Sequence, residues 1–347
     1  MKLARREFIA AAGTAAAGVW MAGCSTGGAP TGTPSAGSAG PKPDPAPGAP
    51  KSRVVLVRTT DRAKGVREAL RLFGDLPVNG KSVLIKPNFN TADAAPASTH
   101  PDILTELIAG LKERGASSLT IGERSGGPEL PGGTREVMER KGIFQLAKDL
   151  GVEVVDFQAA DQWVPFKREG LNWKDGFLYA RAVAEAGAVV TACCLKTHRY
   201  GGVFTLSLKN SVGIVPRQGY GYMSELHSSG QMRKLIAEIN LAYSPALAVI
   251  DGVEVFTEGG PDRGLLVKAG VVLAGSDRVA LDAVGVAILM HLGASTLKGK
   301  KIWEQEQIAR AAELGLGARG PEEIDLVTGD DESKAYAQEI ANLLAKG

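Results

Sequence analysis

The sequence predicts an α/β fold with a mainly parallel, Rossmann-like sheet and helices on both faces. From residue 51 onward, apolar, β-branched runs alternate with amphipathic segments of helical length, which is the pattern of successive βαβ units. Several of the apolar runs end abruptly in polar residues, as buried parallel strands do at their carboxyl ends. The roughly 300 residues of this part suffice for one large domain or two intimately joined lobes.

Each element follows from its local pattern. Short apolar runs bounded by turn residues predict strands at 53–57, 82–85, 119–121, 152–156, 188–195, 246–250, 270–274 and 324–327. Helical periodicity and capping residues predict helices at 61–73, 101–114, 134–150, 179–186, 231–241, 278–291, 301–314 and 333–344. Residues 162–177 carry two tryptophans among charged residues and predict a hairpin or a long loop.

The strand at 188–195 and the segment after it are the centre of the candidate site. The strand ends in three polar residues, Lys196, Thr197 and His198. Gly201 and Gly202 follow, and this glycine pair lets the backbone approach a ligand. Lys209 and Asn210 then add a cation and an amide. Two lysines, a histidine and an asparagine suit an anionic ligand. The alternative is a strand end with solvated lysines and a capping asparagine.

Other strands also end in polar residues. These ends carry Lys86, Asn88, Glu123, Ser125, Asp251 and Asp277. Because the carboxyl ends of parallel strands share one edge of a sheet, we expect a single crevice there, lined by cations, amides, carboxylates and an imidazole.

Acidic residues and the remaining histidines leave several alternatives open. Asp251 and Glu258 lie in a glycine-rich region that we interpret as a turn, where a divalent cation, a proton-transfer role or plain solvation would each fit. Ser98 and Thr99 are capping residues before a predicted helix, whose N-terminus His100 could simply solvate. Asp277 is a candidate N-cap, whereas Asp282 faces either solvent or the crevice. His291 ends an apolar helix and is interpreted as structural.

The first fifty residues predict an exported lipoprotein. Arg5-Arg6 before an uncharged Ala/Gly-rich run resembles a twin-arginine signal, and Met21-Ala22-Gly23-Cys24 resembles a bacterial lipobox. We therefore expect residues 1–23 to be a signal peptide and 24–50 a lipidated Cys24 with a disordered Gly/Pro/Ser tether. The α/β domain occupies 51–347. The expected location is the cell envelope, in the periplasm or on the outer face of the cytoplasmic membrane.

Charge, cysteines and missing motifs exclude several classes of function. The formal net charge of +2 falls near zero once the leader is removed, so neither nucleic acid nor an anionic membrane surface is an expected partner; the membrane is reached through the lipid anchor only. Besides Cys24 there is only the adjacent pair Cys193-Cys194, which predicts buried thiols and no iron–sulfur cluster. The P-loop, dinucleotide-binding, HExxH and GxSxG motifs are all missing from the sequence.

An ordered set of motifs resembles the DUF362 family. It consists of Ile85-Lys86-Pro87-Asn88, Leu195-Lys196-Thr197-His198, Thr205 through Lys209-Asn210 to Gly213, His227, Asp251-Gly252, Glu258-Gly259-Gly260-Pro261, Ser276-Asp277 and Ala280 to Asp282. The resemblance spans roughly residues 53–320 and implies that these strand ends form a shared pocket. Some relatives carry a ferredoxin-like segment, whose cysteines this chain lacks.

Two functions compete at this stage. The first is an extracytoplasmic enzyme acting on a small anionic substrate, with or without a divalent metal, and the second is a non-catalytic lipoprotein that binds a ligand or cofactor for an enzyme partner. The candidate catalytic residues are His198, Lys196 and Asp251. The candidate ligand-binding residues are Lys86, Asn88, Thr197, Lys209, Asn210 and His227. Asp251 and Glu258 are the candidate metal ligands.

Overall fold

A nine-stranded sheet forms the centre of the computed structural model, which describes residues 51–126 and 133–347. Its strand order is β11-β1-β10-β9-β7-β2-β3-β4, with β8 paired to β7. The strands of this sheet are β1 (Ser52–Arg58), β2 (Ser82–Lys86), β3 (Ser118–Glu123), β4 (Glu153–Asp156), β7 (Ala188–His198), β8 (Val203–Thr205), β9 (Leu247–Gly259), β10 (Gly264–Gly275) and β11 (Ile324–Val327).

The sheet is mixed but mostly parallel, as predicted. Strands β4, β3, β2, β7 and β9 run parallel to one another, β1 pairs in parallel with β11, and the short β8 pairs antiparallel with β7. The long strand β10 runs antiparallel to both β1 and β9, because a short connection joins it to β9 as a hairpin. Strand β7 therefore lies between parallel neighbours and delivers its carboxyl end to the middle of one sheet edge.

Helices cover both faces of the sheet. They are α1 (Arg62–Phe73), α2 (Pro101–Glu113), α3 (Gly133–Arg140), α4 (Ile143–Leu150), α5 (Phe157–Ala160), α6 (Arg181–Glu185), α7 (Ser207–Asn210), α8 (Tyr222–Ser228), α9 (Met232–Ile239), α10 (Arg278–His291), α11 (Glu306–Glu313) and α12 (Asp331–Ala345). A second, two-stranded sheet pairs β5 (Trp163–Phe166) with β6 (Phe177–Ala180).

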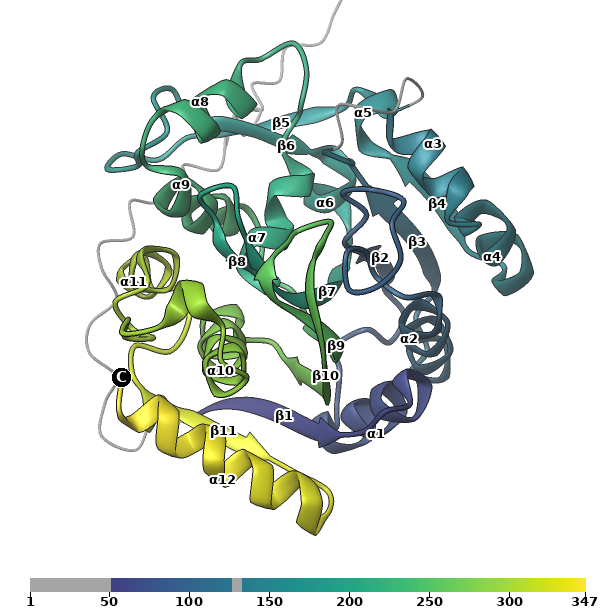
Figure 1. Ribbon diagram of the computed structural model, residues 1–347. Coiled ribbons are helices and arrows are strands. Elements are labelled where there is room, and N and C mark those ends of the chain that lie inside the picture. The colour runs from purple at the N-terminus through teal and green to yellow at the C-terminus, as the bar shows by residue number, and fades with distance from the viewer. Residues whose placement is uncertain (1–50, 127–132) are drawn as a thin grey trace, which may run out of the picture. The chain divides into compact units, whose positions relative to one another are not determined.

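Alternating side chains of the strands divide the core into two layers. Val54 and Leu56 of β1 pack with α10, α11 and α12, whereas Val55 and Val57 pack with α1 and α2 on the opposite face. Figure 1 shows α10 and α1 on either side of β1. A third cluster packs the β5–β6 hairpin, α8 and α9 against Leu84 and Val189.

Several predicted elements match the structure closely. The helix at 278–291 and the strand at 324–327 have the predicted bounds, and the tryptophan-containing segment forms a hairpin. Asp277 caps α10 by accepting backbone N–H groups, as predicted, and His100 caps α2 in the same way. His291 lies at the end of α10 against the Tyr336 ring, in keeping with a structural role.

Several predictions about elements were wrong. The helix predicted at 301–314 begins only at Glu306, and the strand predicted at 270–274 begins already at Gly264. The single helix predicted at 134–150 is two helices, α3 and α4, because the chain turns at Gly142 with a φ of 68°. Residues 179–180 belong to β6, so α6 begins only at Arg181. The predicted strand end at Asp251-Gly252 does not exist, because β9 continues to Gly259 in register with β10.

Candidate functional site

A cavity lies at the carboxyl edge of the parallel strands, where β2, β3 and β7 end beside the segment that contains α7. Its volume is about 60 Å³, room for roughly four to six water molecules. The residues that line it are Lys86, Asn88, Asn90, Glu123, Arg124, Lys196, His198, Thr205, Lys209, Asn210, Val212, Gly213 and Pro261. Lys86, Lys196 and His198 therefore line one cavity, as predicted. Their roles in binding or catalysis stay a prediction.

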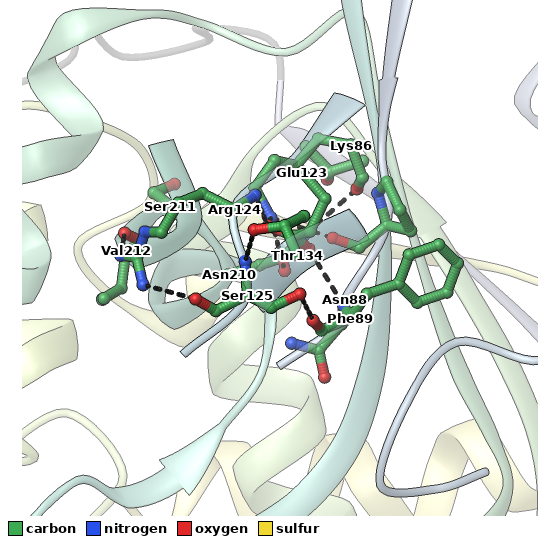
Figure 2. Close-up of polar contacts among 12 residues, drawn as sticks. Lys86, Asn88, Phe89, Glu123, Arg124, Ser125, Thr134, Asn210, Ser211 and Val212 are labelled. Carbon is green, nitrogen blue, oxygen red and sulfur yellow. Dashed lines mark hydrogen bonds and ion pairs between the residues drawn. The ribbon is translucent and has the colours of Figure 1, made fainter. Parts of the chain in front are cut away.

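A buried ion pair forms one wall of this cavity. Nζ of Lys86 lies 2.7 Å from Oε1 of Glu123, and the two side chains are only 1% and 2% exposed. Glu123 also accepts the backbone N–H groups of Phe89 and Arg124, at 2.9 and 2.8 Å; Figure 2 shows these groups around the carboxylate. Burial lowers the pKa of Lys86, and the Glu123 carboxylate opposes that shift.

The ion pair can form only because residue 213 is a glycine. A Cβ at Gly213 would lie 2.4 Å from Oε1 of Glu123 and 2.6 Å from Nζ of Lys86. No real Cβ approaches polar atoms so closely, so any larger residue would push the pair apart. The turn Ser211–Ile214 thus packs its backbone directly against the charged groups.

Arg124 is buried without a carboxylate of its own. Its guanidinium donates to the backbone carbonyls of Val215, at 2.8 Å, and Val212, as Figure 2 shows for Val212. Burial lowers the pKa of Arg124 to about 10, partly opposed by the nearby Glu123 carboxylate. The guanidinium therefore adds a positive charge to the cavity wall while its donors are directed at the main chain.

Lys196 is fully buried at the end of β7. Its Nζ donates to Oδ1 of Asn88 at 3.0 Å and to the backbone carbonyl of Ala97. Burial lowers the pKa of Lys196. No carboxylate among the described residues lies within ion-pair distance of this ammonium group, so only neutral oxygens solvate it.

Lys209 enters the cavity from α7. Among the residues that the structure describes, it makes no hydrogen bond or ion pair. Burial, together with the nearby Lys196 and Arg124 charges, lowers the pKa of Lys209 to about 8. Its neighbour Asn210 donates from Nδ2 to the carbonyl of Lys86 at 3.3 Å and accepts from Nζ of Lys86 at 3.4 Å.

A buried carboxyl group on α10 holds the start of α7. Asp282, fully buried, accepts the backbone N–H of Ser207 at 2.8 Å and that of Leu208 at 3.2 Å. These are N–H groups that a helix start leaves without partners inside the helix. Burial raises the pKa of Asp282 to about 7, against the effect of these hydrogen bonds. Of the two alternatives for Asp282, solvent and crevice, neither holds.

His198 is present as a neutral imidazole. Burial and the charges of Lys209 and Lys196 lower its pKa to about 2. Its Nδ1 is buried and has no hydrogen-bond partner among the described residues, and the same holds for Oγ1 of Thr205. The position that a Cβ on Gly202 would take is 2.9 Å from both Nδ1 of His198 and Cε of Lys209. These two atoms are therefore at most twice that distance apart.

The charges lining the cavity do not balance. Four cations line it, Lys86, Arg124, Lys196 and Lys209, against the single carboxylate of Glu123 among the described lining residues. That carboxylate is already paired with Lys86. Because buried charges are normally paired, the excess of positive charge favours an anionic ligand in this cavity.

The structure does not bring Asp251 and Glu258 to this site. Asp251 lies inside β9 and pairs with Arg62 at 2.8 Å, and Glu258 is exposed near the end of the same strand. They are seven positions apart along the strand, a separation of roughly 20 Å, so they cannot bind one metal ion. Among residues 51–126 and 133–347, no group of three or more His, Cys, Asp or Glu residues could hold a metal ion.

Two predicted ligand-binding residues lie outside the cavity lining. Thr197 is buried and donates its hydroxyl to the carbonyl of Phe256 at 3.1 Å, so it joins β7 to β9. His227 is exposed on α8, where partial burial and the Lys209 charge lower its pKa.

The thiols of Cys193 and Cys194 are buried, and burial raises the pKa of Cys193 to about 12. Cys24 lies outside the described residues.

Some lining residues were missing from the predicted site, chiefly Arg124 and Thr205, and Glu123 was expected at the crevice without a role in binding or catalysis. Glu123 had been placed at a strand end, and Arg124 follows it directly in the sequence. Thr205 and Gly213 begin and end one of the family-like motifs. In each case the signal was present, but a single sequence gave no reason to prefer these residues over their neighbours.

The DUF362 family model, described as a domain of unknown function, matches residues 83–287. This match covers more than half of the chain and includes every strand that supplies a lining side chain. The chain belongs to the DUF362 family. The family resemblance predicted from the strand-end motifs is thereby confirmed, whereas the export signal and lipid anchor stay predictions.

Two solved structures are similar to this DUF362 protein at a low level. The lactate racemase apoprotein from Thermoanaerobacterium thermosaccharolyticum has 12% identity and a TM-score of 0.42, covering 65% of this chain and 54% of that one. A protein from Thermotoga maritima has 13% identity and a TM-score of 0.40, covering 73% of this chain and 59% of the other. The chain thus spans between half and two thirds of the length of either structure. No curated protein matches.

Proposed function

We propose that this DUF362 protein is an enzyme that acts on a small anionic substrate held in the cavity. The observation that carries the proposal is the excess of buried positive charge around a cavity of about 60 Å³. Lys196 and Lys209 would hold the anion, with Asn88 and Asn210 as neutral partners. His198, a neutral imidazole beside them, would exchange protons with the substrate.

The electrostatics support a site that changes its protonation state when it is filled. An anion in the cavity offsets the desolvation of the cations, so it raises the pKa of Lys209 and of His198 from their depressed values. Groups whose pKa is strongly perturbed in a cleft are typical of catalytic sites. Asp251 and Glu258 have no part in this proposal, because they lie elsewhere on β9.

A non-catalytic binding protein is the second candidate. It is favoured by one observation: the two carboxylates expected to complete a proton relay are not at the cavity. The remaining groups would then capture an anionic ligand or cofactor and deliver it to an enzyme partner.

The binding part of the proposal is tested with inorganic phosphate as the probe. Titration calorimetry should give an affinity for the wild type that drops about 100-fold in Lys196→Met, since loss of one desolvated cation costs a few kcal/mol. Lys298→Met is the matched control, because Lys298 is exposed and should leave phosphate binding unchanged. Equal affinity in Lys196→Met and the wild type would refute the site.

A substitution of His198 distinguishes the two candidate functions. Native mass spectrometry of protein purified after export identifies a molecule that copurifies with it, and that molecule is then assayed for conversion. In an enzyme, His198→Gln should retain the molecule and lose conversion. If the wild type binds the molecule and releases it unchanged, the binding-protein function replaces the enzyme.

We also propose that the mature protein is a lipoprotein of the cell envelope. The support is the Arg5-Arg6 pair, the tetrad that ends at Cys24 and the Gly/Pro/Ser-rich tether behind it. Among the described residues, no helix has the length and apolar character needed to cross a membrane.

A further inference from the structure

The four cations of the cavity differ in the hydrogen-bond and ion-pair partners of their nitrogen atoms. Lys86 is paired with Glu123, Lys196 donates to Asn88 and Ala97, and Arg124 donates to main-chain carbonyls. Lys209 alone among these four has neither a hydrogen bond nor an ion pair with any described residue. An amine held in a cavity without a partner is available to react with what the cavity contains.

The surroundings of Lys209 favour its uncharged form. Neighbouring cations and burial bring its pKa to about 8 from 10.5. Near neutral pH, such a shift raises the fraction of free amine by on the order of a hundredfold over an ordinary lysine. A lysine placed beside other cations is one of the recognised ways in which proteins activate an amine as a nucleophile.

A second group within reach can move the protons of such a reaction. Nδ1 of His198 has no hydrogen-bond partner among the described residues, and both it and Cε of Lys209 lie 2.9 Å from the position that a Cβ on Gly202 would take. A side chain on residue 202 would separate the two. The glycine therefore keeps the imidazole and the amine-bearing chain on adjoining sides of the same space.

We propose that the Lys209 amine forms an imine with the carbonyl carbon of a small 2-oxo carboxylate bound in the cavity. This inference rests on the proposed function, because the carboxylate of that ligand is the anion that Lys196 holds. The carbonyl lies one bond from the carboxylate, which suits an amine close to the anion-binding lysine. Ligands of about five or six heavy atoms, such as glyoxylate and pyruvate, fit the room of a few water molecules.

The reaction balances without a further reactant. The lone pair of Nζ forms a bond to the carbonyl carbon, while the C=O π electrons move to oxygen. His198 Nδ1 takes a proton from the nitrogen and returns it to the oxygen, which gives a carbinolamine. A second proton leaves nitrogen as the hydroxyl group leaves carbon, so the products are one imine and one water molecule.

The test traps the imine in the full mature protein. The protein is incubated with glyoxylate and sodium cyanoborohydride, which would leave a carboxymethyl group on the lysine that formed the imine, and peptide mapping by mass spectrometry locates it. Modification of the exposed Lys298 in the same digest measures the background. We expect Lys209 to be modified at least about tenfold faster than Lys298, with a yield that rises between pH 6 and 9 as the free amine accumulates.

Lys209→Arg provides the matched variant. It keeps a cation and removes the nucleophile, so it should still be stabilised by phosphate in a thermal-unfolding assay and should lose the adduct. Gly202→Ala should slow adduct formation by separating His198 from Lys209. A single cooperative thermal-unfolding transition of each variant without ligand shows that it folds.

The outcomes distinguish this inference from the proposed function. Phosphate binding with an adduct on Lys209 supports both. Phosphate binding with no adduct on Lys209 above the Lys298 background overturns the imine and leaves the anion site standing. An adduct that persists in Lys209→Arg on another cavity lysine also overturns the assignment. If neither phosphate binding nor an adduct is seen, both proposals fail.

Discussion

Replacement of Glu123 by glutamine is the sharpest perturbation of the cavity that keeps its shape. It removes the carboxylate that pairs with Lys86 at 2.7 Å, where both side chains are at most 2% exposed. An amide also places an N–H group near the backbone N–H donors of Phe89 and Arg124, which now donate to the carboxylate. Breaking a buried ion pair from one side typically costs about 3–5 kcal/mol, because the other charge is left uncompensated.

Urea denaturation and thermal unfolding measure this cost. The Glu123→Gln protein should lose about 3–5 kcal/mol of unfolding free energy and roughly 10 °C in Tm. The control Glu304→Gln breaks the Lys301–Glu304 pair, in which the side chains are 63% and 67% exposed, and should have no measurable effect. The double variant Lys86→Met/Glu123→Gln should be more stable than Glu123→Gln alone.

The same substitution should act in the opposite direction on ligand binding. Removal of Glu123, the single carboxylate among the described lining residues, leaves four cations around the cavity, so phosphate should bind Glu123→Gln more tightly than wild type at a temperature well below the Tm of both. Two results would contradict the reasoning: a loss of stability below about 1 kcal/mol, or weaker phosphate binding in a variant that remains folded.

Three further outcomes follow from the structure and the sequence. Gly213→Ala should destabilise the fold and weaken phosphate binding, because its Cβ would push Lys86 and Glu123 apart; denaturation and calorimetry check this. The pKa of Lys209 is about 8 in the folded protein and 10.5 ordinarily, so between these pH values the unfolded state binds more protons than the folded state. The free energy of unfolding should therefore rise with pH across this window, and phosphate affinity should fall above pH 8. Lys209→Met should abolish both trends. Cys24→Ala should release the protein from the membrane fraction, and Lys in place of Arg5 and Arg6 should leave precursor in the cytoplasm, both followed by immunoblot after fractionation.

The predicted strand ends were right at β2 and β7, which both lie between strands that run parallel to them. Strands β2 and β7 are buried apolar runs, and the polar residues after them mark the sheet edge. The prediction was wrong at Asp251, because a glycine after an apolar run looks like a turn. Strand β9 instead continues past Gly252, supported by β10 along most of its length. Pairing with a strand later in the chain cannot be recognised from the local pattern.

The charge environment of the cavity was less predictable than its location. A lysine at a strand end has the same local sequence whether a carboxylate pairs with it, as for Lys86, or only amide and carbonyl oxygens do, as for Lys196. These partners come from Glu123, Asn88 and Ala97, which other loops supply. Sequence spacing fixes which side chains reach the edge, whereas the pairing between them depends on how those loops pack.

The residues that remain for a ligand are those whose protonation state can change. Arg124 would be the strongest permanent anion binder, but its donors are taken by the carbonyls of Val212 and Val215. Lys209 and His198 are free to meet a ligand, and both have a pKa well below the ordinary value. A site that only held an anion would bind it more tightly if the Arg124 guanidinium faced the ligand and Lys209 and His198 faced the main chain. In the proposed site, anion binding is coupled to proton uptake, which suits an acid–base reaction, whereas imine formation uses the fraction of Lys209 that is unprotonated near its pKa of about 8.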